Sequence, residues 1–455
     1  MPGGQATRGS AILTRSMVIA CARAWRAEAN EAMDRREDRL ASADQGLRHL
    51  VAVATRAPYG LYIAGQAADT IGLWMQRLAL GWLVWELTGS ATWLGAISFL
   101  KFAPTMLLGL FGGVLADRFP RGRIVLAAQA VTVFQAATVA LLIVTGDISL
   151  PILVVLTLMV GIAVGLSQAA SKAVVSELVP RADVPAAIAL NSVVFNVSQL
   201  AGPALAGVVL VFAGNVACFV AVALLFATNL VVFWRILPHV SARPSGDGQP
   251  MLRAIGTALA FCLRHRGIAP LLALHFAFTF SVRPIIDLLP AFAGGELGDG
   301  VDAVSVLTSA VGLGAIASGL YLAARAHGPG LLRLVMASML VLGLAMLGFA
   351  AAPGLWVAAA MGALIGGGMA VRAAGVQTLV QLAATEDLRG RVLSLYGLGL
   401  NTGAALGAIG VGALADAIGL REAIAAVAVA SLAVLGLVWL RRADMEKALE
   451  AEETR

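Results

Sequence analysis

Charged side chains are scarce in this chain of 455 residues: Asp, Glu, Lys and Arg make up 13% of it, and hydrophobic residues make up 59%. Soluble domains carry about a quarter charged residues, and a water-soluble fold of this length could not bury so much apolar surface. The composition therefore excludes a soluble protein and predicts an integral membrane protein.

Cysteine is also scarce, and the common catalytic motifs are absent. The three cysteines, Cys21, Cys218 and Cys262, lie far apart without a CxxC pair, so they predict neither a disulfide framework nor a metal site. The chain has no GxxxxGK[ST] phosphate loop, no HExxH and no GxSxG; these motifs would indicate ATP hydrolysis or an intramembrane hydrolase. We expect no enzyme, no metal and no cofactor.

Long apolar runs are what the chain has instead. A helix needs about 20 mostly apolar residues to cross a membrane, and turn sequences such as LTGSAT and TGDISLP separate twelve segments of that kind. The predicted membrane helices cover residues 60–86, 91–114, 123–146, 150–175, 186–212, 216–236, 267–293, 301–323, 330–351, 355–381, 391–414 and 420–440.

The basic residues predict the orientation. With both termini in the cytoplasm, the cytoplasmic segments hold 26 of the 32 Lys and Arg residues, as the positive-inside rule requires. Five more lie inside predicted helices, and only Arg421 falls on the other side. Because the basic residues act as topology anchors, the net charge of +6 does not indicate nucleic-acid binding. We predict a multi-pass protein of the inner (cytoplasmic) membrane, with lipid and a small-molecule substrate as its partners.

An internal repeat divides the chain. Residues 195–214 match residues 399–419 after a shift of 205 positions, with Asn196 over Asn401 and three glycines in the same register. Two bundles of this kind are typical of a rocking transporter with its site between them. The predicted divisions are a cytoplasmic tail (1–58), a six-helix bundle (59–236), a cytoplasmic linker with an amphipathic helix (237–266), a second six-helix bundle (267–440) and a cytoplasmic tail (441–455).

The stretch GGVLADRFPRGRIVL, residues 112–126, concentrates four charged residues between two apolar runs. It resembles a signature of the major facilitator superfamily, Gly-x-Leu-Ala-Asp-Arg-x-Gly-Arg, although Pro120 stands in place of the second glycine. The resemblance implies a latch between the two bundles on the cytoplasmic side, made with the start of the eleventh helix. Topology anchoring alone would explain the arginines but not Asp117, which at the membrane edge can pair with an arginine or a helix N-terminus. The expected latch residues are Gly113, Asp117, Arg118, Arg121, Arg123, Arg389 and Arg391.

Other stretches extend the resemblance over most of residues 59–440. LNSVVFNVSQLAGPALAG, LVPRADVPAAIALN and RGRVLSLYGL resemble the branch of the superfamily that includes enterobactin exporters. This implies an all-α membrane protein with twelve transmembrane helices in two pseudo-repeated six-helix bundles. GALADAIG, residues 412–419, mimics the latch stretch, but the repeat places it at the opposite end of its helix. We therefore expect Asp416 in a periplasmic loop.

The fifth predicted helix bears on the direction of transport. Its GPALAG, residues 202–207, resembles an antiporter signature, Gly-Pro-x-x-Gly-Gly, and the resemblance implies export. The alternative is a kink that serves packing only, because proline bends a helix and small residues admit a close neighbour. The residues of this site are Ser198, Gly202, Pro203, Ala206 and Gly207.

Two carboxylates lie well inside predicted helices, Asp69 in the first and Asp287 in the seventh. Buried ionisable groups in membranes are costly and indicate function, and a carboxylate that alternates between wet and dry surroundings can couple transport to protons. The alternatives are a hydrogen bond between helices for Asp69 and a static i,i+4 pair with Arg283 for Asp287.

The superfamily lines its cavity with helices one, four, seven and ten. A cationic cavity there suits an anionic or catechol-like cargo, although snorkelling toward the cytoplasm is an alternative for Lys172 and Arg372. The candidate cavity residues are Gln66, Gln76, Arg77, Gln168, Lys172, His275, Arg283, Arg372 and Gln377.

The sequence thus predicts a monomeric secondary active transporter that exports a small siderophore-like or drug-like molecule by proton antiport with alternating access. Two alternatives stay open: a proton-coupled importer on the same fold, and a membrane sensor or assembly partner that does not transport.

Overall fold

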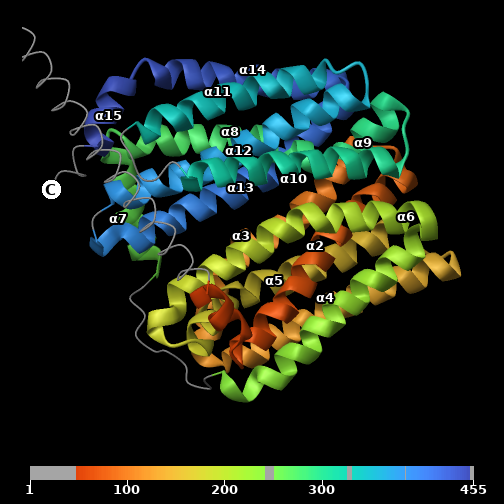
Figure 1. Ribbon diagram of the computed structural model, residues 1–455. Helices are drawn as coiled ribbons and strands as arrows, with labels where there is room; N and C mark the ends of the chain where they lie inside the picture. The colour runs from red at the N-terminus through yellow and green to blue at the C-terminus, as the bar shows by residue number, and fades with distance from the viewer. Residues whose placement is uncertain (1–47, 241–250, 325–329, 385, 451–455) are drawn as a thin grey trace, which may run out of the picture.

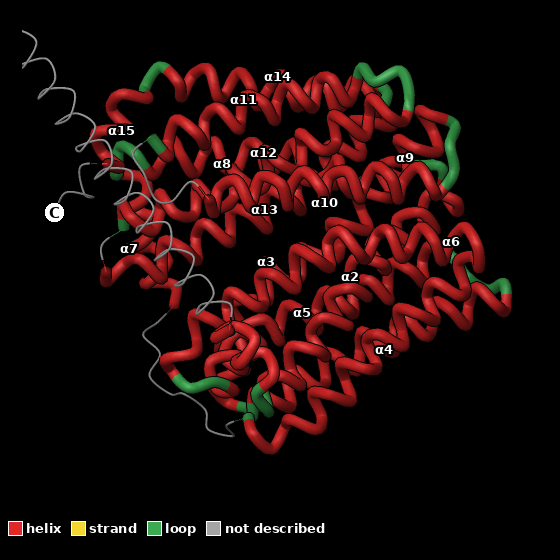
Figure 2. The backbone as a smooth tube through the Cα atoms, viewed as in Figure 1, coloured by secondary structure: helices red, strands yellow, loops and turns green. Residues whose placement is uncertain are grey.

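The computed structural model describes residues 48–240, 251–324, 330–384 and 386–450. In these ranges the chain consists of helices and the turns between them, without a strand (Figures 1 and 2). The predicted all-α membrane fold is confirmed.

The first bundle contains five long helices. They are α2 (Tyr59–Thr88), α3 (Ala91–Arg118), α4 (Arg121–Thr145), α5 (Leu150–Leu178) and α6 (Val184–Ile236), with the short turns η1 (Arg181–Asp183) and η2 (Leu237–His239) on either side of α6.

The second bundle follows the amphipathic helix α7 (Met251–Arg264). Its elements are α8 (Ile268–Asp287), α9 (Leu289–Ala291), η3 (Phe292–Leu297), α10 (Val301–Ala324), α11 (Leu331–Ala350), α12 (Leu355–Ala383), α13 (Glu386–Ile418) and α14 (Leu420–Trp439), and the short helix α15 (Arg442–Glu450) comes last.

Helix α6 is two helices joined without a loop. It counts 53 residues, and Gly214 in its interior has φ 78° and ψ 179°. A straight helix of that length would measure about 80 Å, far more than the ~30 Å hydrocarbon core. The non-helical backbone at Gly214, which glycine adopts at little cost, is therefore where the predicted fifth and sixth helices meet.

Ten helices of the described residues are long and apolar enough to cross a membrane, with α6 counted once. Helix α2 is not among these ten, and its 30 residues include the polar side chains Gln66, Asp69, Gln76 and Arg77. The count of twelve crossings and the predicted bundle boundaries stay predictions.

Two helix pairs make most of the contacts between the bundles, α3 with α13 and α6 with α10. Glycines permit the first approach: a Cβ on Gly95 would overlap the backbone of Ala408, and a Cβ on Gly412 would overlap that of Ala91. Both contacts lie near the start of α3. The bundles thus meet at the end where α3 begins and diverge toward the end that carries α7 and α15 (Figure 1).

Arg421, at the start of α14, ties several elements together at the end where the bundles meet. Its guanidinium donates to Glu296 of η3 (2.8 Å) and to the carbonyl oxygens of Ala350 (2.8 Å), the last residue of α11, and Ala352 (2.7 Å), which follows α11. It also lies 5.2 Å from the centre of the Phe292 ring. The residue that departs from the predicted charge asymmetry is thus neutralised by a carboxylate and fixed by backbone acceptors.

Candidate functional site

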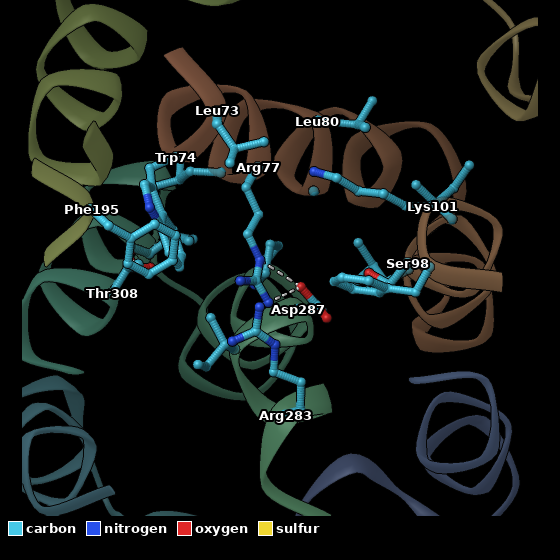
Figure 3. A pocket seen from close by; sticks show the side chains of 18 residues that line it. Leu73, Trp74, Arg77, Leu80, Ser98, Lys101, Phe195, Arg283, Asp287 and Thr308 are labelled. Carbon is cyan, nitrogen blue, oxygen red and sulfur yellow. Dashed lines mark hydrogen bonds and ion pairs between the residues drawn. The ribbon is translucent and has the colours of Figure 1, made fainter. Parts of the chain in front are cut away.

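A cavity of about 160 Å³ lies between the two bundles (Figure 3). Its polar lining comes from both of them: Arg77 of α2, Ser98 and Lys101 of α3, Arg283 and Asp287 of α8, and Thr308 of α10. Within the described ranges, no group of three or more His, Cys, Asp or Glu side chains could hold a metal ion.

An ion pair joins the bundles across this cavity. Arg77 donates from Nε to Oδ1 of Asp287 at 2.8 Å and from a terminal nitrogen to the same oxygen at 2.5 Å. The side chains are only 15% and 6% exposed. Asp287 thus pairs with an arginine on the other bundle, and the alternative, an i,i+4 pair with Arg283, is not among the ion pairs of the described residues.

The cavity carries an excess of positive charge. Arg283 approaches Asp287 from the same helix (Figure 3), with its guanidinium 5.9 Å from the centre of the Phe102 ring. Lys101 lines the same space. Three cations therefore share the cavity with one carboxylate, Asp287, the only one among the lining residues. The second oxygen of that carboxylate, Oδ2, is buried without a hydrogen-bond partner among the described residues.

Aromatic side chains close one side of the cavity. Trp74 packs edge-on against Phe195 of α6, with ring centres 5.8 Å apart, and Arg77 lies 5.3 Å from the Trp74 ring centre, within the range of a cation–π contact. Phe195 also lines an open hollow of about 520 Å³ on α5 and α6. The hollow and the cavity therefore share a single aromatic wall residue.

Arg372 and His275, both predicted for the cavity, lie instead inside the second bundle. Arg372 is 2% exposed and donates to Nδ1 of His275 (2.9 Å), its carbonyl oxygen (3.2 Å) and the Thr279 hydroxyl (3.0 Å). The His275 ring packs against Tyr396 with centres 4.4 Å apart. This polar cluster holds α12 against α8 and α13, and neither predicted residue lines the cavity.

The predicted glutamines contribute little to the cavity. Gln76 is hydrogen bonded to Gln135 of α4, and Gln66 donates to Thr70 one turn away at 3.4 Å. Gln168 is half-buried and Gln377 is exposed. The Lys172 side chain lies outside the part of the chain that the structure describes. Of the nine predicted residues, the cavity lining includes Arg77 and Arg283.

Asp69 is separate from the cavity lining. It is half-buried in α2 and lies beside Asn229 of α6. Gly65, one turn earlier, leaves room for Asn229, whose side-chain oxygen lies 2.8 Å from the position a Cβ would take. Asp69 thus belongs to the packing of α2 on α6, the arrangement expected of a helix–helix contact.

The GPALAG stretch of α6 lies where this helix crosses two others. Gly202 packs on α2, where a Cβ would lie 3.0 Å from the carbonyl oxygen of Ile71. On the other side, Ser305 of α10 donates to the carbonyl oxygen of Pro203 at 3.1 Å, and a Cβ on Gly207 would overlap the Ser305 side chain. Ser198 and Ala206 are buried. The motif therefore packs its own bundle and also contacts the other one.

The predicted latch falls largely on side chains outside those that the structure describes. These are Gly113, Asp117, Arg118, Arg389 and Arg391. Arg121 pairs with Glu177 of α5 at 2.7 Å, within the first bundle, and Arg123 is exposed on α4. The latch stays a prediction.

Asp416 makes a contact that the sequence did not reveal. The loop placement was wrong, because Asp416 lies in the last turn of α13. Its carboxylate accepts hydrogen bonds from the Ser90 hydroxyl (2.5 Å) and from the backbone N–H groups of Ala91 (2.9 Å) and Thr92 (3.0 Å). It therefore caps the N-terminus of α3 from the other bundle, where a negative charge is favourable.

The chain matches the family described as "Transmembrane secretion effector" over residues 47–454. Enterobactin exporter EntS of Salmonella typhimurium is 29% identical over 76% of this chain and 82% of its own length. Macrolide efflux protein A of Streptococcus pyogenes is 25% identical over 79% of this chain and 89% of its own length. Staphyloferrin A transporter of Staphylococcus aureus is 24% identical over 31% of this chain, and the match spans only 36% of that relative.

Solved structures share the fold at low identity. A POT family transporter superposes with a TM-score of 0.71, 11% identity and coverage of 85% of this chain and 96% of that one. A bacterial homologue of the human lysosomal transporter Spinster, in an inward-facing and occupied conformation, superposes with a TM-score of 0.66 and 15% identity. The match covers 87% of this chain and 98% of that one. These likenesses establish that this chain shares the fold of the two solved structures.

Proposed function

Because the chain belongs to the transmembrane secretion effector family, which consists of major facilitator superfamily transporters and not of enzymes, we propose that it exports a small organic molecule in exchange for protons. The chain is a multi-pass protein of the inner membrane, and we propose that it acts as a monomer with both termini in the cytoplasm. The observation that carries the proposal is the Arg77–Asp287 ion pair, which spans the two bundles at a cavity wall.

The positions at which the bundles touch support alternating access. Contacts of α3 with α13 and of α6 with α10 close one end, and the helices diverge toward α7 and α15 (Figure 1). We assign the diverging end to the cytoplasm, because the basic residues of the loops concentrate there. In this assignment cargo reaches the cavity from the cytoplasm past Phe195, and it leaves after the bundles rock.

The cavity favours a cargo rich in phenolic or other hydroxyl groups. Arg77, Lys101 and Arg283 supply hydrogen-bond donors for oxygen atoms, and the free Oδ2 of Asp287 can accept a hydrogen bond from a cargo hydroxyl. The cavity alone is smaller than the roughly 300–1,000 Å³ of pockets for drug-sized ligands. A cargo of that size would displace Phe195 and extend into the neighbouring hollow of about 520 Å³. The relatives named for enterobactin and macrolide export support a cargo of this class.

Hydroxyl groups on the cargo also make cargo binding and proton binding oppose each other, as antiport requires. A cargo O–H that donates to Asp287 requires the ionised carboxylate, so cargo and a proton compete for the same oxygen. A permanently anionic cargo would instead displace Asp287 from Arg77 and favour its protonation, so that proton and cargo would bind together. Linkage is reciprocal, and proton uptake from the outer side would therefore release a hydroxyl-rich cargo there.

The test is transport into inverted vesicles or proteoliposomes under an imposed pH gradient. A catecholate siderophore without iron and a macrolide are suitable cargoes, and a carboxylate of similar size serves as the anionic comparison. We expect the pH gradient to drive accumulation of the hydroxyl-rich cargo. We expect Asp287→Asn to abolish this accumulation. Asp147→Asn, which removes an exposed carboxylate in the turn after α4, is the matched control. Flux that ignores both the gradient and Asp287→Asn would refute the antiport mechanism.

The two alternatives predict other results. Accumulation in right-side-out vesicles, with none in inverted ones, would indicate an importer. A protein that co-purifies with the chain, together with an absence of gradient-driven flux for any cargo tested, would indicate a sensor or assembly partner.

The cation-rich cavity gives a separate test of cargo binding. Arg77→Gln and Arg283→Gln should each weaken cargo binding about tenfold or more, as expected for lost charge-assisted hydrogen bonds.

A further inference from the structure

A second hollow, of about 480 Å³, lies far from the cavity between the start of α4 and the end of α6. Its lining consists of Pro120, Gly122 and Arg123 from α4 and its N-cap, and of Trp234, Arg235, Leu237, Pro238 and Val240 from α6, η2 and the residue after it. None of these residues lines the transport cavity.

Two arginines from different helices border this hollow. Arg123 and Arg235 are both exposed, and no carboxylate of the described residues lies within ion-pair distance of either. Arg121, two residues before Arg123, differs because it pairs with Glu177 at 2.7 Å. The hollow therefore presents two positive charges without a described counter-charge.

The hollow lies at the boundary of the apolar belt. Helix α4 begins its apolar span at Arg121, and the span of α6 ends with η2 at His239. Trp234, 64% exposed, lies beside the two arginines. Tryptophan prefers the headgroup level of a bilayer, and Lys or Arg near the ends of membrane helices reach the phosphate layer. Charge and aromatic surface thus occur together at one depth.

The shape of the hollow depends on a close approach of η2 to α4. A Cβ on Gly122 would overlap the side chain of Leu237, and it would lie 3.6 Å from Val240. Glycine here lets the turn after α6 pack against the first turn of α4 and form an apolar floor. The floor makes this a site for a ligand that is partly apolar, because a free inorganic ion gains nothing from apolar walls.

We propose that this hollow binds the headgroup of an anionic phospholipid, with Arg123 and Arg235 contacting the phosphate and Trp234 contacting the glycerol and upper acyl region. Each arginine supplies charge-assisted hydrogen bonds to phosphate. The lipid joins α4 to the end of α6, the point from which the chain leaves the first bundle toward α7.

The test is lipid binding to the purified full-length chain by native mass spectrometry, with phosphatidylglycerol compared with phosphatidylcholine of the same chains. We expect retention of phosphatidylglycerol over phosphatidylcholine, about tenfold weaker retention in Arg235→Gln and a further decrease in Arg123→Gln/Arg235→Gln. Arg181→Gln is the matched control, since Arg181 is an exposed arginine in η1, outside the hollow. Thermal unfolding in detergent without lipid verifies that the variants fold.

Three outcomes would overturn the proposal. Equal retention of the two lipids would remove the anionic headgroup as the ligand. An equal loss in Arg181→Gln would indicate a diffuse charge effect. Displacement of the lipid by millimolar inorganic phosphate would indicate a site for a free anion. The result is independent of transport, so failure here and failure of the export mechanism are distinguishable.

Discussion

Arg77 and Asp287 are separated by 210 positions in the chain, yet their side chains share two hydrogen bonds. Their environment makes the pair asymmetric, because Arg283 and Lys101 line the same cavity. If Arg77 is lost, Asp287 still has cations nearby. If Asp287 is lost, three cations remain without a carboxylate among the lining residues. The two partners are therefore not equivalent for folding.

We predict that Asp287→Asn lowers the free energy of unfolding by about 3–5 kcal/mol, the usual cost of removing one member of a buried ion pair. Arg77→Gln should lower the free energy of unfolding by less. The double variant should be more stable than Asp287→Asn alone, because one uncompensated cation is removed as well. Thermal unfolding of all three in one detergent measures the coupling. Strict additivity of the two single effects would contradict the pairing.

Sequence reasoning identified both members of this pair but not their partnership. An ionisable residue inside an apolar run is visible in the sequence, and its cost in a membrane marks it for attention. The partner depends on the rotation of each helix about its axis and on how two bundles meet, and no local spacing encodes either. The same limit applies to Arg372, whose acceptors on α8 placed it inside one bundle and not in the cavity.

At the scale of elements, glycines set how closely helices approach. Gly366 of α12 packs on α10 so tightly that a Cβ would overlap the backbone of Val311. Backbone cannot move aside as a flexible side chain does. We predict that Gly366→Ala separates α10 from α12 and lowers the melting temperature by several degrees, through an overpacking cost of about 1–3 kcal/mol.

Gly436→Ala in α14 is the control for that change, because nothing lies within 4 Å of the position a Cβ would occupy. Alanine has the better helix propensity by up to about 1 kcal/mol, so this variant should melt at the same temperature or slightly higher. A comparable loss in both variants would mean that propensity, and not close packing, accounts for the effect.

Helix positions were predictable to within a few residues because glycine and proline turns separate the apolar runs. The segment predicted at 150–175 is α5, Leu150–Leu178, and the segment predicted at 60–86 is α2, Tyr59–Thr88. The second helix was predicted to end at 114, whereas α3 continues to Arg118. Charged residues mark the edge of the apolar belt, but they do not end a helix. The helical hydrogen bonds of α3 continue through its charged last turn to Arg118.

At the scale of the whole molecule, Asp416 connects the two bundles at one end of their interface. Its carboxylate accepts three hydrogen bonds at the N-terminus of α3. These bonds exist only while α3 and α13 are in contact at that end. Rocking of the bundles to open this end would break them.

We predict that Asp416→Asn shifts the population toward the state that is open at this end, since an amide keeps the shape but loses the charge at a helix N-terminus. Distances between spin labels at the ends of α3 and α13 should lengthen or broaden. Asp302→Asn is the control, because Asp302 is an exposed acid in the first turn of α10. Unchanged distance distributions in Asp416→Asn would show that this cap does not govern the equilibrium.

Arg421 has a structural role at the end where the two bundles meet. If both termini lie in the cytoplasm, as the basic residues predict, Arg421 lies on the translocated face, against the charge bias of the other loops. The Glu296 carboxylate compensates that cation, and the guanidinium also has two carbonyl acceptors. In the folded protein the charge of Arg421 is therefore paired, and this one side chain joins three connections: the one that contains η3, the one between α11 and α12, and the one before α14.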